Sequence, residues 1–209
     1  MIADHWPTYA VRIRTPRLCL RLPDDDELAA LANVAAQGVH PPGEQPFLIP
    51  WTDGTTEQRA QDDPSPPLEP ASELAADQLA TRTRCLPWRR PRRNGEHVGP
   101  RLLDCSRGRL GLTHQGGGIG TEARTGLLTF AFEYLDATDA VTQVFPENHA
   151  SRAVSRKLGY TPDGISRDER GGEAVISHRL RLTAAEWAAR DHVPVTVECL
   201  DQARSMFVE

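Results

Sequence analysis

Hydrophobic and polar residues first alternate regularly near the start of the chain. Between residues 17 and 22 every second residue is a leucine, and the residues between them are arginine or cysteine. This period of two predicts a half-buried strand that ends at Pro23. Acidic residues at 24–26 then precede leucines and alanines at helical spacing over residues 28–35, with Gly38 as the stop. The chain is therefore expected to open with a strand followed by an amphipathic helix.

Regular patterns return after residue 110. They predict, in order, a helix over about 121–135, a strand over 140–145, a helix that follows Asn148 and stops at Gly159, a hairpin of residues 164–170 and 173–182, and a short helix behind a capping box at 183–186. Together with the opening elements, this order predicts a single α/β (α+β) domain over residues 1–209, with residues 186–209 as a C-terminal extension.

The middle of the chain breaks these patterns. Residues 61–109 contain seven prolines, one valine and no isoleucine, phenylalanine or tyrosine. Proline removes backbone donors, and β-branched and aromatic residues are the usual strand formers, so this segment is a poor source of strands. A short helix could form over 72–83, whereas residues 84–109 predict no packed element. We therefore interpret residues 61–109 as an anomalous, disordered segment.

Composition narrows the classes of protein that fit. The chain has 209 residues and a formal net charge of -5, which fits one domain and disfavours a mainly electrostatic nucleic-acid binder. No apolar run approaches the roughly 18 residues of a membrane span, and the N-terminus does not resemble a signal peptide, so we expect a cytoplasmic protein with no membrane contact. The four cysteines are scattered, so neither a disulfide framework nor a metal site is expected.

The sharpest local signal is the sequence Gln-Gly-Gly-Gly-Ile-Gly at residues 115–120, which follows an apolar stretch and precedes a predicted helix. The N-terminus of a helix has unpaired backbone N–H groups, and glycines let an anion approach them closely. The lysine of a nucleotide triphosphatase loop is missing here, and Thr121 stands where a dinucleotide fingerprint needs its third glycine. The segment predicts an anion-binding loop, and a plain glycine-rich turn is the alternative.

The glycine loop and two other segments of the chain together match a known pattern. Gln115, Gly118 and Gly120 match the pattern Q/R-x-x-G-x-G, and a later block runs from Asn148 to Lys-Leu-Gly-Tyr at 157–160. In this order they resemble the GNAT superfamily of N-acetyltransferases. Residues 15–21 are similar to the opening strand of the subgroup that acetylates the N-termini of ribosomal proteins. The resemblance covers about residues 10–60 and 110–185.

The resemblance implies a GNAT-like mixed sheet flanked by helices. Its fourth and fifth strands would splay apart to hold the pantetheine of the co-substrate, acetyl-CoA. A neutral amine would attack the thioester directly, with no metal and no covalent enzyme intermediate. The residues implied in cofactor binding are Leu110, Leu112, Gln115, Gly116, Gly117, Gly118, Ile119, Gly120, Thr121, Asn148 and Ser151.

The catalytic acid and base are less well defined. Many members of this superfamily protonate the leaving thiolate with a tyrosine in the second helix, and Ser155 occupies that position here. Glu44, in an apolar and proline-rich loop, is the candidate for attracting an amine, and a solvated loop carboxylate is the alternative. His114 is more simply a solvent-facing histidine, and Glu122 more simply favours the helix dipole.

The same resemblance makes residues 61–109 harder to explain. They should supply the second and third strands and part of the fourth, which would form the centre of the sheet, so these central strands are in doubt. We interpret the segment as a compensated frameshift in a GC-rich gene, with indels near codons 61 and 109 that are either real or a sequencing error. A real frameshift would give a product expected to misfold or to lack turnover.

Read as it stands, the same segment offers a rival function. Six arginines between Arg82 and Arg93 surround Trp88 and could bind single-stranded nucleic acid. The alternatives to an active N-acetyltransferase are thus a non-catalytic relative and a nucleic-acid-binding module. The amine acceptor, a small molecule or a protein N-terminus, is not readable from the sequence. Homodimerisation is common in such families.

Overall fold

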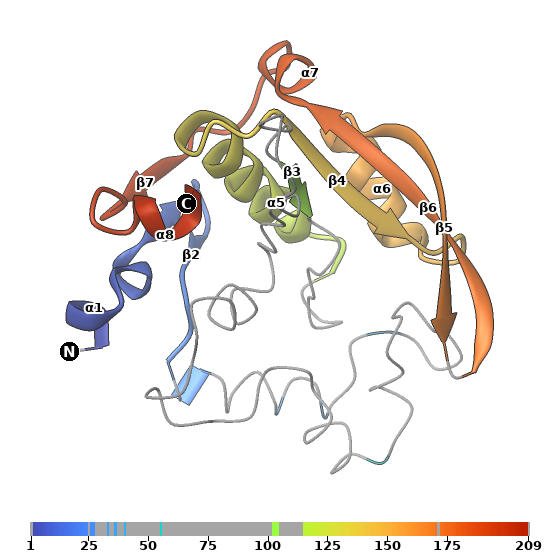
Figure 1. The fold of residues 1–209 in the computed structure, drawn as a ribbon, viewed down its shortest axis with the longest axis horizontal. Coiled ribbons are helices and arrows are strands. Elements are labelled where there is room, and N and C mark those ends of the chain that lie inside the picture. Colours follow the sequence, from blue (N-terminus) through green and yellow to red (C-terminus); the bar gives the residue numbers. More distant parts are fainter. Residues whose placement is uncertain are drawn as a thin grey trace, which may run out of the picture.

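A computed structural model describes residues 2–24, 26–27, 102–104, 115–170 and 172–208, together with positions 33, 36, 40 and 55. Helix α5 lies in the middle of this part of the molecule, with a small sheet on one side and a larger sheet on the other (Figure 1). The marked N- and C-termini both lie on the side of the small sheet.

The small sheet joins the two ends of the described chain. After helix α1 (Ile2–His5) and the 3-10 helix η1 (Pro7–Ala10), strand β1 (Arg12–Arg14) pairs antiparallel with β2 (Cys19–Leu20) and with β7 (Thr196–Glu198). The predicted strand over 17–22 is therefore confirmed in part. It is shorter because residues 15–18 form a turn, in which the Thr15 N–H donates to the Leu18 carbonyl at 2.9 Å.

Helix residues occur where the first helix was predicted. Asp26, Glu27, Asn33 and Ala36 are helical. The rest of that predicted helix, with its stop at Gly38, lies outside the described residues.

The larger sheet has four strands in the order β3-β4-β6-β5. Strand β3 (Leu102–Asp104) runs parallel to β4 (Asp139–Val144), whereas β6 (Glu173–Thr183) is antiparallel to β4 and to β5 (Thr161–Arg170). The predicted mixed sheet and the predicted hairpin are both confirmed. Gly172, with φ of +86°, adopts the left-handed backbone in the hairpin turn.

Strand β3 corrects one expectation. Residues 84–109 were predicted to contain no packed element, yet Leu102–Asp104 pairs with β4. Strand pairing uses backbone N–H and C=O groups, and no proline occupies these three positions, so the poor composition of the segment did not prevent it. The remainder of 61–109, including the predicted helix at 72–83 and the Arg82–Arg93 cluster, lies outside the described residues.

The helices follow the predicted pattern closely. Helix α5 (Ile119–Thr129) continues into a π-helical turn, η4 (Phe130–Tyr134), so the helix predicted over 121–135 is confirmed with an earlier start. Helix α6 (His149–Leu158) begins after Asn148 and ends at Gly159, whose φ of +94° is left-handed. Helix α7 (Ala184–Ala188) begins with the predicted capping box of Thr183 and Glu186. Local signals therefore placed all three helices.

One hydrophobic core joins both sheets to α5 and α6. Its most buried large side chains include Leu128, Phe130, Leu182 and Trp187, each at most 1% exposed. Burial of side chains of this size supplies most of the favourable free energy of folding.

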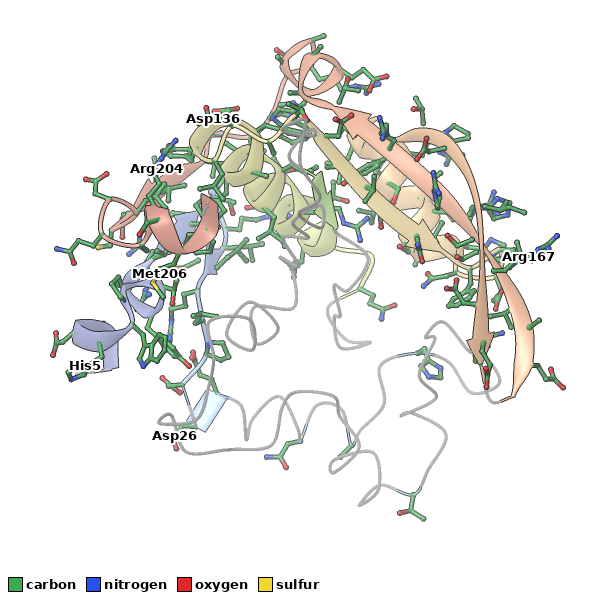
Figure 2. All side chains as sticks on the ribbon, in the orientation of Figure 1. His5, Asp26, Asp136, Arg167, Arg204 and Met206 are labelled. Carbon is green, nitrogen blue, oxygen red and sulfur yellow. The ribbon has the colours of Figure 1, made fainter. Side chains whose placement is uncertain are left out.

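The C-terminal extension packs against the same core. Phe207 of helix α8 (Arg204–Val208) meets Phe130 edge-on, with ring centroids 5.3 Å apart. Arg204 on α8 pairs with Asp136 at 2.9 Å, and both residues are labelled in Figure 2. Among the described residues, no helix is long and apolar enough to cross a membrane.

Candidate cofactor-binding site

The glycine loop leads into α5 as an exposed turn. Residues 115–118 are exposed, and Gly116 and Gly118 have φ of +78° and +79°, a conformation that costs residues with a Cβ atom roughly 1 kcal/mol or more. Gly118 is the N-cap of α5. The glycines are therefore needed for the backbone path of the loop.

Within the described part of the chain, the first turn of α5 keeps its backbone donors open. Gly118 offers no side-chain cap, and the Glu122 N–H donates to the Gly118 carbonyl at 3.0 Å as the first hydrogen bond of the helix. The N–H groups of Ile119, Gly120 and Thr121 consequently have no acceptor within the helix. These three donors, at the positive end of the helix dipole, can bind an anion.

The described residues also leave space beside the loop. A Cβ atom built on Gly116, Gly117 or Gly120 would meet no described atom within 4 Å. A bulky anion such as the pyrophosphate of acetyl-CoA can therefore approach this backbone closely, and the glycine loop fits that group.

A buried carboxylate lies in the same turn. Glu122 is 7% exposed, and its Oε1 accepts hydrogen bonds from the Thr15 hydroxyl at 2.6 Å and from the Arg17 backbone N–H at 2.8 Å. Its Oε2 pairs with Arg17 Nε at 2.5 Å. The Thr15 hydroxyl holds the pKa of this carboxyl below its ordinary value. Burial opposes that change, and hydrogen bonds and charge from Arg17 add to it.

Sequence reasoning missed this arrangement. The simpler interpretation of Glu122, a favourable charge at a helix N-terminus, fits its place in the first turn but does not account for its burial. Thr15 and Arg17 are 107 and 105 positions away along the chain, so no local spacing could have revealed the contact. The available signals were an acidic residue on the buried side of α5 and an arginine in the opening segment.

The N-terminus of α6 is built differently. Asn148 Oδ1 accepts the backbone N–H of Ser151 at 3.0 Å, so the helix is capped by its own side chain. Asn148 and Ser151, both predicted to contact the cofactor, are half-buried and adjacent at this terminus. The capping interpretation of Asn148 is confirmed. Contact with a cofactor stays a prediction for both residues.

Ser155 is fully buried between two helices. Its side chain is 0% exposed, and its hydroxyl accepts a hydrogen bond from Arg124 on α5 at 3.0 Å. A serine oxygen that accepts in this way still has its own proton to donate. Its predicted role as the proton donor stays a prediction.

Four of the residues considered from the sequence are not described structurally. Leu110 and Leu112, expected beside the pantetheine, fall outside the described residues, as do Glu44 and His114. The β3–β4 pairing extends from Leu102↔Asp139 to Asp104↔Val141, and the chain between β3 and the glycine loop is also outside them. The expected splay of the two strands stays a prediction. Among the side chains that are described, no group of three or more His, Cys, Asp or Glu is placed to hold a metal ion.

Comparison with known proteins gives one broad match. Residues 17–161 match the family described as the acetyltransferase (GNAT) domain. This span includes the glycine loop and the whole of α6.

Solved structures give partial matches. A protein described as a probable acetyltransferase is 27% identical over 41% of this chain and 49% of its own, with a TM-score of 0.38. A GCN5-related N-acetyltransferase from Brucella melitensis is 20% identical over 42% and 41%, with a TM-score of 0.39. Ribosomal-protein-S5-alanine acetyltransferase from Vibrio fischeri is 18% identical over 45% and 52%, with a TM-score of 0.40. The chain thus spans about half the length of these proteins.

Proposed function

The chain belongs to the acetyltransferase (GNAT) domain family, and from this premise we propose that it transfers an acetyl group from acetyl-CoA to a primary amine. The observation that carries the proposal is the uncapped N-terminus of α5. Three consecutive backbone N–H groups have no acceptor within the helix, and the glycine loop in front of them is exposed. The phosphates of acetyl-CoA are anions of the kind that such a terminus binds.

The cofactor would lie across both helix termini. Backbone N–H groups of residues 116–121 would hold the pyrophosphate, with Gln115 at the entrance of the loop. Because Asn148 Oδ1 is occupied by the cap, its side-chain N–H groups would contact the cofactor. Ser151 would offer its hydroxyl from the first turn of α6. The pantetheine arm would run beside Leu110 and Leu112.

Acetyl-CoA supplies an activated acyl group, so the protein's task is to orient the thioester and the amine and to manage two protons. A neutral amine attacks the thioester carbonyl, the carbon–sulfur bond breaks, the nitrogen releases one proton to solvent, and the leaving thiolate gains another. Ser155 is the proposed proton donor, with Arg124 holding its oxygen. Glu44 is the proposed attractant for the amine.

Replacing Ser155 tests the proposed proton donor. Ser155→Ala is expected to lower kcat about a hundredfold, the lower end of general acid catalysis, while the Kd for CoA stays within twofold. Ser177→Ala is the matched control, since Ser177 is also buried, at 1%, and bonds to Asp168 at 3.0 Å in the hairpin. Equal kcat values for the two variants would assign Ser155 a purely structural role.

Radiolabelled acetyl transfer tests the function itself. The full chain is incubated with [14C]acetyl-CoA and three classes of acceptor: a peptide with a free N-terminus, a polyamine and an aminoglycoside. Label transferred to one class identifies the acceptor. Binding of CoA without transfer to any class supports a non-catalytic relative, and absence of CoA binding contradicts the proposal.

A further inference from the structure

Three residues from two distant parts of the chain meet at the first turn of α5. The Glu122 carboxylate receives the Thr15 hydroxyl, the Arg17 backbone N–H and Arg17 Nε, at 2.6, 2.8 and 2.5 Å. We call Thr15, Arg17 and Glu122 the brace. With one carboxylate satisfied by three donors, the brace fixes where the Arg17 guanidinium lies.

The guanidinium then reaches the glycine loop. Arg17 Nη1 donates to the Gly117 carbonyl at 3.0 Å. A Cβ atom built on Gly118 would lie 3.3 Å from Arg17 Nη2, so the arginine also lies close to the Gly118 backbone. One side chain therefore connects the buried carboxylate to the loop.

Peptide geometry gives this contact a direction. The Gly117–Gly118 peptide is planar and trans, so its N–H points opposite to its C=O. Because Arg17 holds the Gly117 carbonyl on one side, the Gly118 N–H faces the other. Without this contact, fixing the peptide in this orientation when the ligand binds would cost conformational entropy, because a glycine backbone is freer than that of any other residue.

The scaffold behind the brace is firmly placed. Thr15 closes its own turn, accepting the Leu18 N–H at 3.1 Å through its hydroxyl. A Cβ on Gly126 of α5 would be 3.2 Å from both Thr15 Cγ2 and Leu20 Cδ1, so helix and turn are in close contact. The Arg17 side chain itself is 54% exposed, so solvent screens its ion pair with Glu122, and the pair is less stabilising than a fully buried one would be. Its position next to the loop is therefore better explained by orientation than by stability.

We propose that Arg17 and Glu122 are positioning residues that orient the Gly118 N–H toward the phosphate of bound CoA. Arg17 acts through the Gly117 carbonyl, and Glu122 acts through Arg17. The inference rests on the proposed function, because it assigns the phosphate of CoA to this loop. The inference adds one requirement to the glycine pattern: an arginine from the opening segment must lie beside the loop.

Lysine at position 17 separates orientation from stability. A single ammonium can keep the ion pair with Glu122, but it lacks the planar fork that serves the carboxylate and the loop carbonyl together. Arg17→Lys is expected to weaken CoA binding about five- to tenfold, roughly the effect of one lost hydrogen bond, with little change in Tm. Arg17→Gln should weaken binding at least as much and also lower Tm.

Arg14→Gln is the matched control. Arg14 lies on the neighbouring strand β1 and pairs with Glu198 at 2.6 Å, and its side chain is 52% exposed, but it does not contact the loop. This variant should change Tm little, because both side chains of its ion pair are about half exposed, and it should leave the Kd for CoA unchanged. The Kd is measured by calorimetric titration of the full chain with CoA. The ¹H–¹⁵N resonance of Gly118 is recorded in parallel without ligand.

The two readouts distinguish the possible failures. A CoA affinity in Arg17→Lys equal to wild type, with an unmoved Gly118 resonance, would overturn the inference while leaving the proposed function intact. If the wild-type chain bound no CoA, the proposed function would fail and the phosphate assignment with it. The orientation claim would then be decided by whether Gly118 shifts in Arg17→Lys but not in Arg14→Gln.

Discussion

Helices α5 and α6 begin in opposite ways, although the sequence predicted cofactor contacts at both. At α5 the N-cap is Gly118, with φ of +79° and no side chain to close the turn. At α6 the N-cap is Asn148, with φ of -81° and an oxygen that takes the Ser151 N–H. A helix N-terminus is thus available to an anion only where the protein withholds its own cap. This difference separates the proposed phosphate site from a neighbouring terminus of similar polarity.

The two termini are also held differently. The first turn of α5 is fixed by the brace, whose partners lie more than a hundred positions away along the chain. The first turn of α6 is fixed by Asn148, three positions from its partner. An open terminus needs support from elsewhere in the fold, since its own first residues supply none.

The largest expected effect comes from placing an acidic side chain at the N-cap of α5. Gly118→Asp places a carboxylate where the phosphate would bind, so both charge repulsion and competition for the N–H groups oppose the ligand. We expect CoA affinity to fall at least about a hundredfold, equivalent to about 2.7 kcal/mol. Calorimetric titration measures it.

Backbone strain alone could mimic this loss, so a control must carry the same strain. Gly172→Asp provides it, because Gly172 has φ of +86° in the hairpin turn, with no described atom near a Cβ built there. Gly172→Asp should lower Tm and leave CoA affinity unchanged. Similar losses of CoA affinity in Gly118→Asp and Gly172→Asp would mean that backbone strain weakens binding. The proposed difference between the α5 and α6 termini would then have no support.

An intermediate effect is expected at α6. Asn148→Asp keeps a good cap but loses the side-chain N–H donors, so stability should hold while CoA affinity falls about fivefold, as for one lost hydrogen bond. Asn148→Ala loses the cap as well, at a cost of about 1 kcal/mol in the free energy of unfolding. Urea denaturation and CoA titration of both variants check this. Unchanged affinity in Asn148→Asp would restrict Asn148 to capping.

The smallest effect concerns acid stability. The Thr15 hydroxyl, followed by Arg17, holds the pKa of Glu122 below its ordinary value. A lowered pKa in the folded state means that the stabilisation is complete above the unfolded carboxyl value, about 4.3, and is lost as the pH falls through the folded value. Between about pH 5 and pH 2, wild type should therefore lose more Tm than Glu122→Gln.

A second carboxylate provides the comparison for that experiment. Hydrogen bonding from Arg14 lowers the pKa of Glu198 in the same sense, far from the loop. Glu198→Gln should flatten the acid limb of the Tm curve too, but only Glu122→Gln should also weaken CoA binding at pH 7. Parallel acid curves for wild type and Glu122→Gln would contradict the brace.

Local signals predicted much of this structure. The cap at Asn148, the left-handed stop at Gly159 and the capping box at Thr183 are each specified by a few neighbouring residues. These signals placed α6 and α7 correctly, because capping depends on short-range hydrogen bonds.

Long-range features could not be predicted in this way. Strands β1 and β7 pair with Arg14 opposite Thr196, and the Arg14 side chain bonds to Glu198, 184 positions away. Neither three-residue strand has a pattern long enough to detect. Glu122 illustrates the same limit at the site. The proposed frameshift over 61–109 stays a prediction, and sequencing the gene across this segment tests it directly.

The most direct test of the account maps CoA onto the backbone of the two helices. Full-length protein labelled with ¹⁵N is titrated with CoA, and amide shifts are followed at Gly118–Thr121 in α5 and at His149–Arg152 in α6. The account predicts saturable shifts that are largest at the four α5 amides, with the capped Ser151 amide shifting less. Largest shifts at α6, or no saturable shift at either terminus, would contradict it.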